Sequence, residues 1–158
     1  MKYIVLLTAM LTTLLMSEEL QVKANSFSAD ENSGISIFSG DVNVIKHNDE
    51  LNASEVTIYV DKEKQPTKFI AIGKVSFVLE TEQGEVYTGK ADKVIYLPMK
   101  KEYRFYQNVH LVQLGDKKEI RGEEVVLKTI EGKAYAKGLE TEPVIMIFKI
   151  PDEEKKEK

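Results

Sequence analysis

The chain has 158 residues, contains neither cysteine nor tryptophan, and carries a formal net charge of −4 at pH 7. Its length suffices for one domain with a hydrophobic core. The lack of cysteine excludes disulfides, a thiolate nucleophile, a CxxC zinc site and a lipidated N-terminal cysteine. The mildly acidic charge argues against nucleic-acid binding, which a basic surface favours.

The N-terminus has the layout of an export signal. Lys2 precedes an apolar run over residues 3–16, and Ser17 and two glutamates follow it. The run is shorter than the roughly 20 residues that a helix needs to cross a bilayer. We therefore expect residues 1–17 to be a signal peptide that is cleaved on export, rather than a membrane anchor.

Beyond residue 17, apolar and polar residues alternate in short runs rich in Val, Ile, Phe and Tyr, which is the period of half-buried strands. The first run is "LQVKA" (20–24) and the last is "PVIMIFKI" (143–150), with polar turns such as "DENSG" (30–34) between the runs. The pattern predicts an all-β chain of about a dozen short strands, mostly antiparallel and linked by hairpins. The charged end "PDEEKKEK" (151–158) is expected to be a disordered tail.

One strand pattern occurs three times, anchored at Gly40, Gly73 and Gln107, which lie 33 and 34 residues apart. Gln107 departs from the glycine of the first two copies, and Gly138 is the candidate start of a truncated fourth copy. Positions two before, two after and four after each anchor are apolar and share one strand face. These residues are Phe38, Val42, Val44, Ala71, Val75, Phe77, Phe105, Val109 and Leu111.

A second strand type follows each copy, as "LNASEVTIYV" (51–60), "TGKADKVIYL" (88–97) and "IRGEEVVLKT" (120–129). The repeated unit is therefore two strands and a turn, and stacking of the units joins their apolar faces into one surface. The pattern alone leaves open whether this surface is a filled core or an open groove, and it favours the filled core. The second strand adds Val56, Ile58, Val94, Tyr96, Val125 and Leu127 to the apolar face.

The order and spacing of these strands resemble the lipopolysaccharide transport protein A family, also called OstA-like, in its periplasmic bridge component. The resemblance covers residues 20–148, and no single motif in it is specific by itself. It implies a domain over 18–150 that is one curved antiparallel β-jellyroll, a sheet folded over like a taco around an apolar groove. The segments that carry it are "LQVKANSFSAD" (20–30), "FSGDVNV" (38–44), "LNASEVTIYV" (51–60), "AIGKVSF" (71–77), "GKADKVIY" (89–96) and "GEEVVL" (122–127).

The resemblance implies a periplasmic carrier without enzymatic activity, which shields the acyl chains of lipopolysaccharide on their way from the inner to the outer membrane. Physical chemistry agrees with this role, because each CH₂ group removed from water is worth roughly 0.8 kcal/mol. The residues expected to line the groove are Leu20, Val22, Phe38, Val42, Val44, Val56, Ile58, Val75, Phe77, Val94, Tyr96, Phe105, Val109, Leu111 and Leu127.

The resemblance also implies partners that dock on edge strands. It places an LptC-like protein at the N-terminal edge, an LptD-like protein at the C-terminal edge, and further copies of the chain head to tail. Exposed strand edges favour such strand addition. The residues expected at these edges are Leu20, Val22, Val144, Ile145, Met146, Ile147 and Phe148.

Two other interpretations stay open. An LptC-like relative would keep an uncleaved anchor, and a secreted structural or adhesive repeat protein would have a dry core. Catalysis and cofactors have little support, because neither a GxSxG elbow nor a GxxxxGK[ST] phosphate loop occurs. His47 lies in a turn with Asp49 and Glu50 that is more typical of a solvated turn than of a metal site, and His110 is expected on the polar strand face. Asn52 begins an N-x-[ST] glycosylation pattern but leads directly into a predicted strand.

Overall fold

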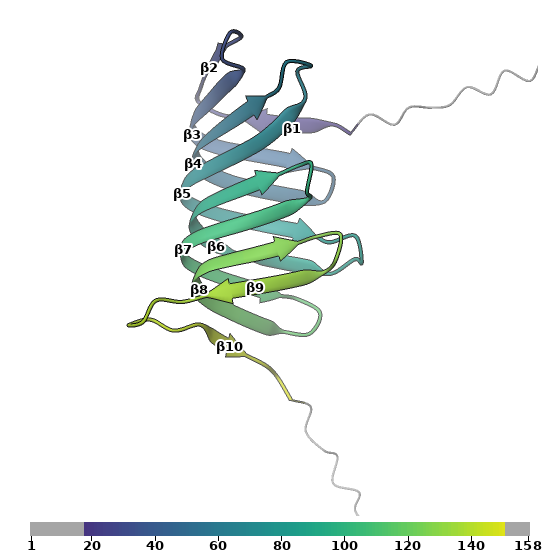
Figure 1. Ribbon diagram of the computed structural model, residues 1–158, viewed down its shortest axis with the longest axis vertical. Helices are drawn as coiled ribbons and strands as arrows, with labels where there is room; N and C mark the ends of the chain where they lie inside the picture. Colours follow the sequence, from purple (N-terminus) through teal and green to yellow (C-terminus); the bar gives the residue numbers. More distant parts are fainter. Residues whose placement is uncertain (1–17, 151–158) are drawn as a thin grey trace, which may run out of the picture.

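The computed structural model describes residues 18–150, so the predicted signal peptide and the predicted charged tail lie outside the described residues. All ten strands in this range form one antiparallel sheet (Figure 1). No helix of a length and hydropathy that would span a bilayer occurs between residues 18 and 150. The strands are β1 (Leu20–Lys23), β2 (Ser26–Asp30), β3 (Ile35–Lys46), β4 (Asp49–Val60), β5 (Pro66–Glu80), β6 (Val86–Leu97), β7 (Glu102–Gln113), β8 (Lys118–Lys128), β9 (Lys133–Lys137) and β10 (Ile145–Ile147).

The sheet folds over on itself along a line that we call the crease. The pairing register shifts at this line between all neighbouring strands from β3 to β8, for example between Ser39 and Val42 on β3. One half of β3 pairs with β1 and the other with β2, and β8 is shared between β10 and β9 in the same way. We call the half that ends in β1 and β10 layer A, and the half that ends in β2 and β9 layer B.

Two consecutive left-handed residues produce the crease on every second strand. They are Gly40 with Asp41 (φ 81° and 44°), Gly73 with Lys74 (83° and 48°) and Gln107 with Asn108 (65° and 51°). A left-handed backbone favours glycine because a Cβ atom clashes with the following carbonyl oxygen. The third copy has the same backbone with glutamine, so the departure seen in the sequence does not change the fold there.

Small side chains face the crease from the intervening strands. Ala53 pairs with Val42, Ala91 pairs with Val75, and Gly122 takes the same place in the third copy. Both alanines are buried, because the two layers converge at this line. The alignment of Ala53, Ala91 and Gly122 in the sequence therefore reflects the limited space inside the fold.

The two ends of the sheet are built alike. At one end, β1 and β2 are the two halves of an interrupted strand, joined where the Asn25 N–H donates to the Gly40 carbonyl oxygen at 2.9 Å. At the other end, β9 runs up to Gly138, and residues 138–144 separate it from β10. The truncated fourth copy expected from Gly138 is thus present as two short strands, one in each layer.

The predicted fold class is confirmed, whereas the prediction of about a dozen short strands is wrong. Six of the ten strands, β3 to β8, are 11 to 15 residues long and pass through both layers. The last strand is also shorter than predicted, with Ile145–Ile147 in place of 143–150.

Candidate functional site

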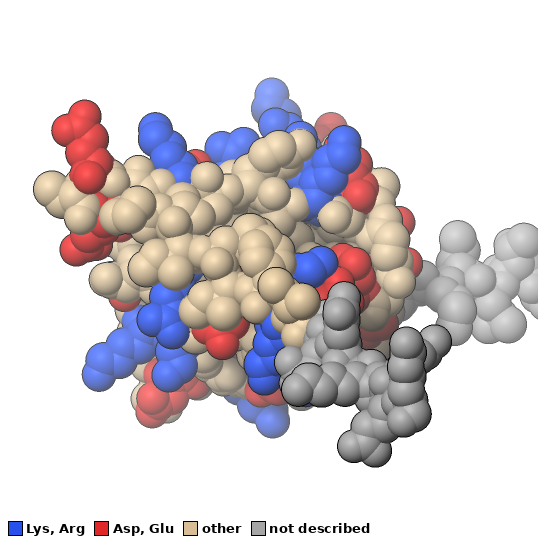
Figure 2. Space-filling view, turned by 90° about the horizontal axis from the view of Figure 1, so that it is seen from below, with Lys and Arg blue, Asp and Glu red and all other residues tan. Residues whose placement is uncertain are grey.

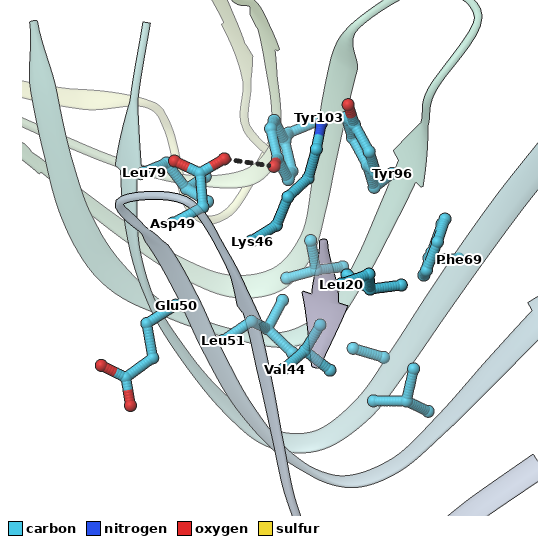
Figure 3. Close-up of a pocket in the computed structure, with 13 residues that line it drawn as sticks. Leu20, Val44, Lys46, Asp49, Glu50, Leu51, Phe69, Leu79, Tyr96 and Tyr103 are labelled. Carbon is cyan, nitrogen blue, oxygen red and sulfur yellow. Dashed lines mark hydrogen bonds between the residues drawn. The ribbon is translucent and has the colours of Figure 1, made fainter. Parts of the chain in front are cut away.

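An apolar cavity of about 70 Å³ lies between the two layers, near the end of the molecule that β1 forms (Figure 3). Empty apolar cavities of about 150 Å³ hold a single benzene molecule. The cavity is therefore too small to enclose a whole acyl chain. Layer A contributes Leu20, Val44, Leu51 and Leu79 to the wall, and layer B contributes Val56, Phe69, Ala71, Val94, Tyr96 and Tyr103.

Beyond the cavity, the layers pack directly against each other. Six side chains in this part are less than 2% exposed, and the rings of Phe77 and Phe105 pack at an angle of 33° with 4.5 Å between their centroids. The apolar face recognised in the sequence is thus a filled core over much of its length, with a cavity at the β1 end. These six side chains are Val42, Val75, Phe105, Leu111, Val125 and Leu127.

The structure separates the expected groove residues into three sets. Five of them line the cavity: Leu20, Val44, Val56, Val94 and Tyr96. Two are partly buried and pack against the core: Val22 and Phe38. Eight lie in the packed interior: Val42, Ile58, Val75, Phe77, Phe105, Val109, Leu111 and Leu127.

Sequence reasoning missed four apolar residues of the cavity wall: Leu51, Phe69, Leu79 and Tyr103. The repeat contains the signal that identifies three of them. Phe69 and Tyr103 each stand four residues before an anchor, and Leu79 stands six after one. Because strand residues two apart share a face, extending the aligned positions by one step in each direction would have found them.

One end of the cavity is polar. The Tyr103 hydroxyl donates to Asp49 Oδ2 at 3.0 Å, and the Glu80 N–H donates to Asp49 Oδ1 at 2.8 Å. Burial raises the pKa of the Asp49 carboxyl, against the effect of these two hydrogen bonds. Burial also raises the pKa of Tyr103 well above its usual value, and the charge of Asp49 adds to this. The tyrosine is therefore a neutral donor at physiological pH.

Lys46 extends over the same end of the cavity (Figure 3). Its Nζ lies 5.7 Å from the centre of the Tyr96 ring and 3.0 Å from Glu18 Oε2. Burial is the largest single effect on Lys46 and lowers its pKa, but the interactions with Glu18 and Tyr96 together outweigh it, so that the pKa of Lys46 is raised. Aliphatic and aromatic groups thus form the wall of the cavity, and charged and hydroxyl groups form its polar end.

The histidines lie apart from this cavity wall. His47 Nε2 is 3.7 Å from Glu18 Oε1 in the exposed turn between β3 and β4. His110 is on the outer face of layer A, where its Nε2 lies 3.0 Å from Glu119 Oε2. Within residues 18–150, no group of three or more His, Asp or Glu side chains is arranged to hold a metal ion. Asn52 on β4 accepts a hydrogen bond from Asn43 Nδ2 at 2.9 Å.

The expected partner edges have exposed apolar side chains. Leu20 on β1 is 37% exposed, whereas Val22 is partly buried against the core. At the other end, Figure 2 shows uncharged atoms over the centre of the surface and charged side chains around its margin. The exposed apolar residues in and beside β10 are Val144, Ile145, Met146, Ile147 and Phe148.

A sheet folded over a partly open apolar interior defines the class of this protein, a curved β-jellyroll. Among solved structures, it resembles LptH of Pseudomonas aeruginosa, described as the LptA homologous periplasmic component of the lipopolysaccharide transport device. The two superpose with a TM-score of 0.74 at 18% identity, over 84% of this chain and 96% of LptH. No curated protein sequence matches the chain.

The model of one protein family, LptA/(LptD N-terminal domain) LPS transport protein, matches residues 21–133. This match spans most of the 158 residues. The chain belongs to this family, as its resemblance in sequence predicted.

Proposed function

We propose that this protein is a periplasmic bridge component that carries lipopolysaccharide from the inner to the outer membrane. It holds the acyl chains between its two layers and leaves the sugars in water. One observation carries the proposal: in a member of an LPS transport family, an apolar cavity lies between the layers and ends in polar groups. Burial of acyl chains supplies the binding energy, at roughly 0.8 kcal/mol for each CH₂. The protein uses no chemistry of its own.

Export by a cleaved signal peptide over residues 1–17 belongs to this proposal. The layout of that segment supports it, as does the description of LptH as a periplasmic component. Sequencing the N-terminus of the exported protein tests it. An N-terminus at residue 18 is expected, and a membrane-bound chain that begins at Met1 would instead support the LptC-like alternative.

The partners are proposed to dock on the two ends of the sheet. An LptC-like protein adds a strand beside β1 and β2, an LptD-like protein adds one beside β9 and β10, and copies of the chain join head to tail in the same way. Unpaired backbone groups at these ends and the apolar side chains around β10 support this arrangement.

Binding of lipopolysaccharide by matched variants tests the proposed function. Leu20→Asp places a charge on the cavity wall, where a bound acyl chain would strip it of water, so we expect affinity to fall at least tenfold. Gln21→Asp is the control, because Gln21 is the next residue on β1 and faces outward. Thermal unfolding of both variants checks that the fold is intact. Equal affinities for the two variants would contradict the proposed groove.

A second candidate is a secreted structural repeat protein with a dry core. The six fully buried side chains of the packed interior favour it. It predicts that the exported protein is purified without lipid and that neither variant changes any lipid binding. Recovery of lipopolysaccharide with the purified wild-type protein would exclude it.

A further inference from the structure

The two layers meet at the crease on one side, and on the opposite side their hairpin turns face each other. We call this second line the seam. Near the β1 end, two contacts cross it. Lys46 of layer A lies over the Tyr96 ring of layer B. Asp49 of layer A accepts a hydrogen bond from the hydroxyl group of Tyr103 in layer B. These two contacts stand directly above the apolar cavity.

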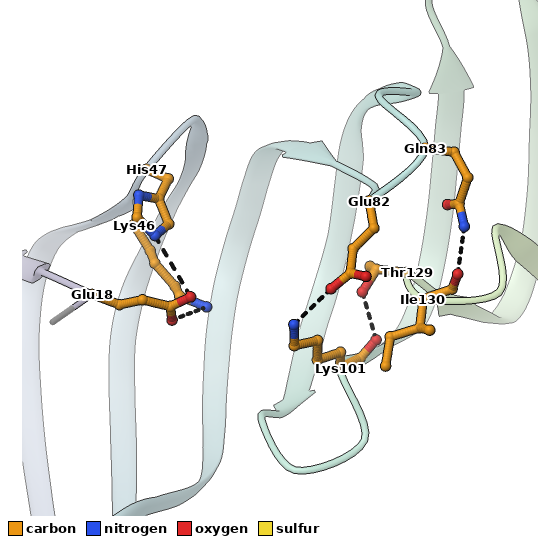
Figure 4. Close-up of polar contacts among 8 residues, drawn as sticks. All are labelled: Glu18, Lys46, His47, Glu82, Gln83, Lys101, Thr129 and Ile130. Atoms are coloured by element: carbon orange, nitrogen blue, oxygen red, sulfur yellow. Dashed lines mark hydrogen bonds and ion pairs between the residues drawn. The ribbon is translucent and has the colours of Figure 1, made fainter. Parts of the chain in front are cut away.

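A second group of contacts crosses the seam farther along, where the turn between β5 and β6 reaches over to layer B (Figure 4). Lys101 Nζ lies 2.6 Å from Glu82 Oε1, and the Glu82 N–H donates to the Thr129 carbonyl oxygen at 3.3 Å. The Gln83 side chain donates to the Ile130 carbonyl oxygen. One turn of layer A is thus held by two turns of layer B.

A polar depression of about 230 Å³ lies between the two groups of contacts. It shares four residues with the apolar cavity: Lys46, Asp49, Tyr96 and Tyr103. The cavity therefore lies directly beneath the seam. Four carboxylates and two lysines line the depression, and this excess of negative charge makes it a poor permanent site for a phosphate group.

The seam and the crease differ in how firmly they join the layers. At the crease the layers are continuous, because β3 to β8 all pass through it and are paired on both sides. At the seam, the contacts described above are one exposed ion pair, three hydrogen bonds and one contact of a lysine with an aromatic ring. An exposed ion pair contributes little to stability. Separation of the layers is therefore easiest at the seam, with the left-handed residues of the crease as the hinge.

From this difference we infer that the seam is a gate for lipid. The contacts of Lys46, Asp49 and Glu82 with layer B part to let the acyl chains in between the layers, and they close again when the lipid leaves. The cavity of about 70 Å³ is the closed state of the binding site. This inference rests on the proposed function, since it describes how the same site takes up its ligand.

Locking the seam tests the gate, and the lack of native cysteine makes the design simple. In the full exported chain, Glu82→Cys and Lys101→Cys are joined by a short, reducible bifunctional thiosulfonate linker. Asp116→Cys with Lys118→Cys is the matched control, because that ion pair is also exposed, at 2.7 Å, but lies within one turn of one layer. Uptake of fluorescently labelled lipopolysaccharide is measured before linkage, after linkage and after reduction.

The gate predicts that linkage across the seam slows uptake at least tenfold, that reduction restores it, and that the control pair is unaffected. Glu82→Gln with Lys101→Gln, which weakens the seam without a linker, is expected to speed uptake. Normal uptake by the linked protein would overturn the gate and leave the proposed function intact. If the unlinked wild-type chain takes up no lipid, the proposed function fails, and the gate fails with it.

Discussion

Single residues set the shape of this protein at the crease, where the backbone is left-handed three times. At Gly73 two effects add up, because φ is 83° and a Cβ atom would lie 2.6 Å from Ser54 Oγ. Gly84 has nearly the same φ, 81°, but nothing lies within 4 Å of its Cβ position. The two glycines therefore separate the cost of backbone strain from the cost of a steric clash.

For Gly84→Ala we expect a loss of about 1 kcal/mol in the free energy of unfolding, from backbone strain alone. For Gly73→Ala we expect about 3 kcal/mol, because the clash with Ser54 adds to the strain. Urea denaturation of both variants measures the two losses. Equal losses would show that Ser54 moves aside at no cost and that the crease tolerates a side chain there.

Gln107 offers the opposite test, since it is an exposed non-glycine residue with φ 65°. Replacement by glycine removes a strain of about 1–2 kcal/mol, against an entropic cost of about 0.5–1 kcal/mol in the unfolded chain. We expect Gln107→Gly to raise the free energy of unfolding by up to about 1 kcal/mol. A clear loss of stability in the same denaturation experiment would mean that the glutamine side chain stabilises the third crease.

Tyr87 gives the core a pH dependence at alkaline pH. Burial, together with the charge of Glu85, raises the pKa of Tyr87 to about 12. The contribution of the protonated Tyr87 to the free energy of unfolding is complete below pH 10, the usual pKa of tyrosine. It is lost as the pH rises toward 12, because the tyrosine of the unfolded chain loses its proton at a lower pH than that of the folded chain. Between pH 9 and pH 12, we expect Tyr87→Phe to lose about 2 kcal/mol less stability than the wild type. Tyr135→Phe, at an exposed tyrosine, should follow the wild type.

At the scale of the elements, the sequence predicts which residues face inward but not where the strands bend. Period-2 alternation identified the inner face of each repeat, and the structure buries Val42, Val75 and Val109 there. The same alternation is compatible with two short strands joined by a turn or with one long strand bent at a crease. Glycine occurs both in turns between strands and in bent strands, so Gly40 and Gly73 do not distinguish the two. At Gln107 the residue type gives no indication of a bend. The bend depends on contacts between distant strands.

The small residues at the crease leave little space for a larger side chain between the two layers. Ala91 is 3% exposed and pairs with Val75 where the layers converge. We expect Ala91→Leu to lower the free energy of unfolding by about 1–3 kcal/mol through overpacking. Lys90→Leu on the exposed face of the same strand should change it by less than about 0.5 kcal/mol. Thermal or urea unfolding of the pair checks this difference.

For the whole molecule, the decisive property is the space between the layers, which the sequence could not predict. The pattern favoured a filled core and the family resemblance favoured a groove, and the structure contains both in different parts. Phe77 and Phe105 pack against each other, whereas Tyr96 lines the cavity. The period-2 alternation places all three aromatic side chains on the inner face of their strands. What distinguishes them is how far the layers are apart at each point, and this depends on the whole sheet.

Site-specific photocrosslinking in cells shows directly whether lipopolysaccharide binds between the layers. A benzophenone amino acid in place of Tyr96 would lie at the cavity, and the same group in place of Tyr106 would lie on the outer face of layer B. Binding between the layers predicts a lipopolysaccharide adduct from position 96 and none from position 106. Equal labelling at both positions, or no adduct from position 96, would contradict it.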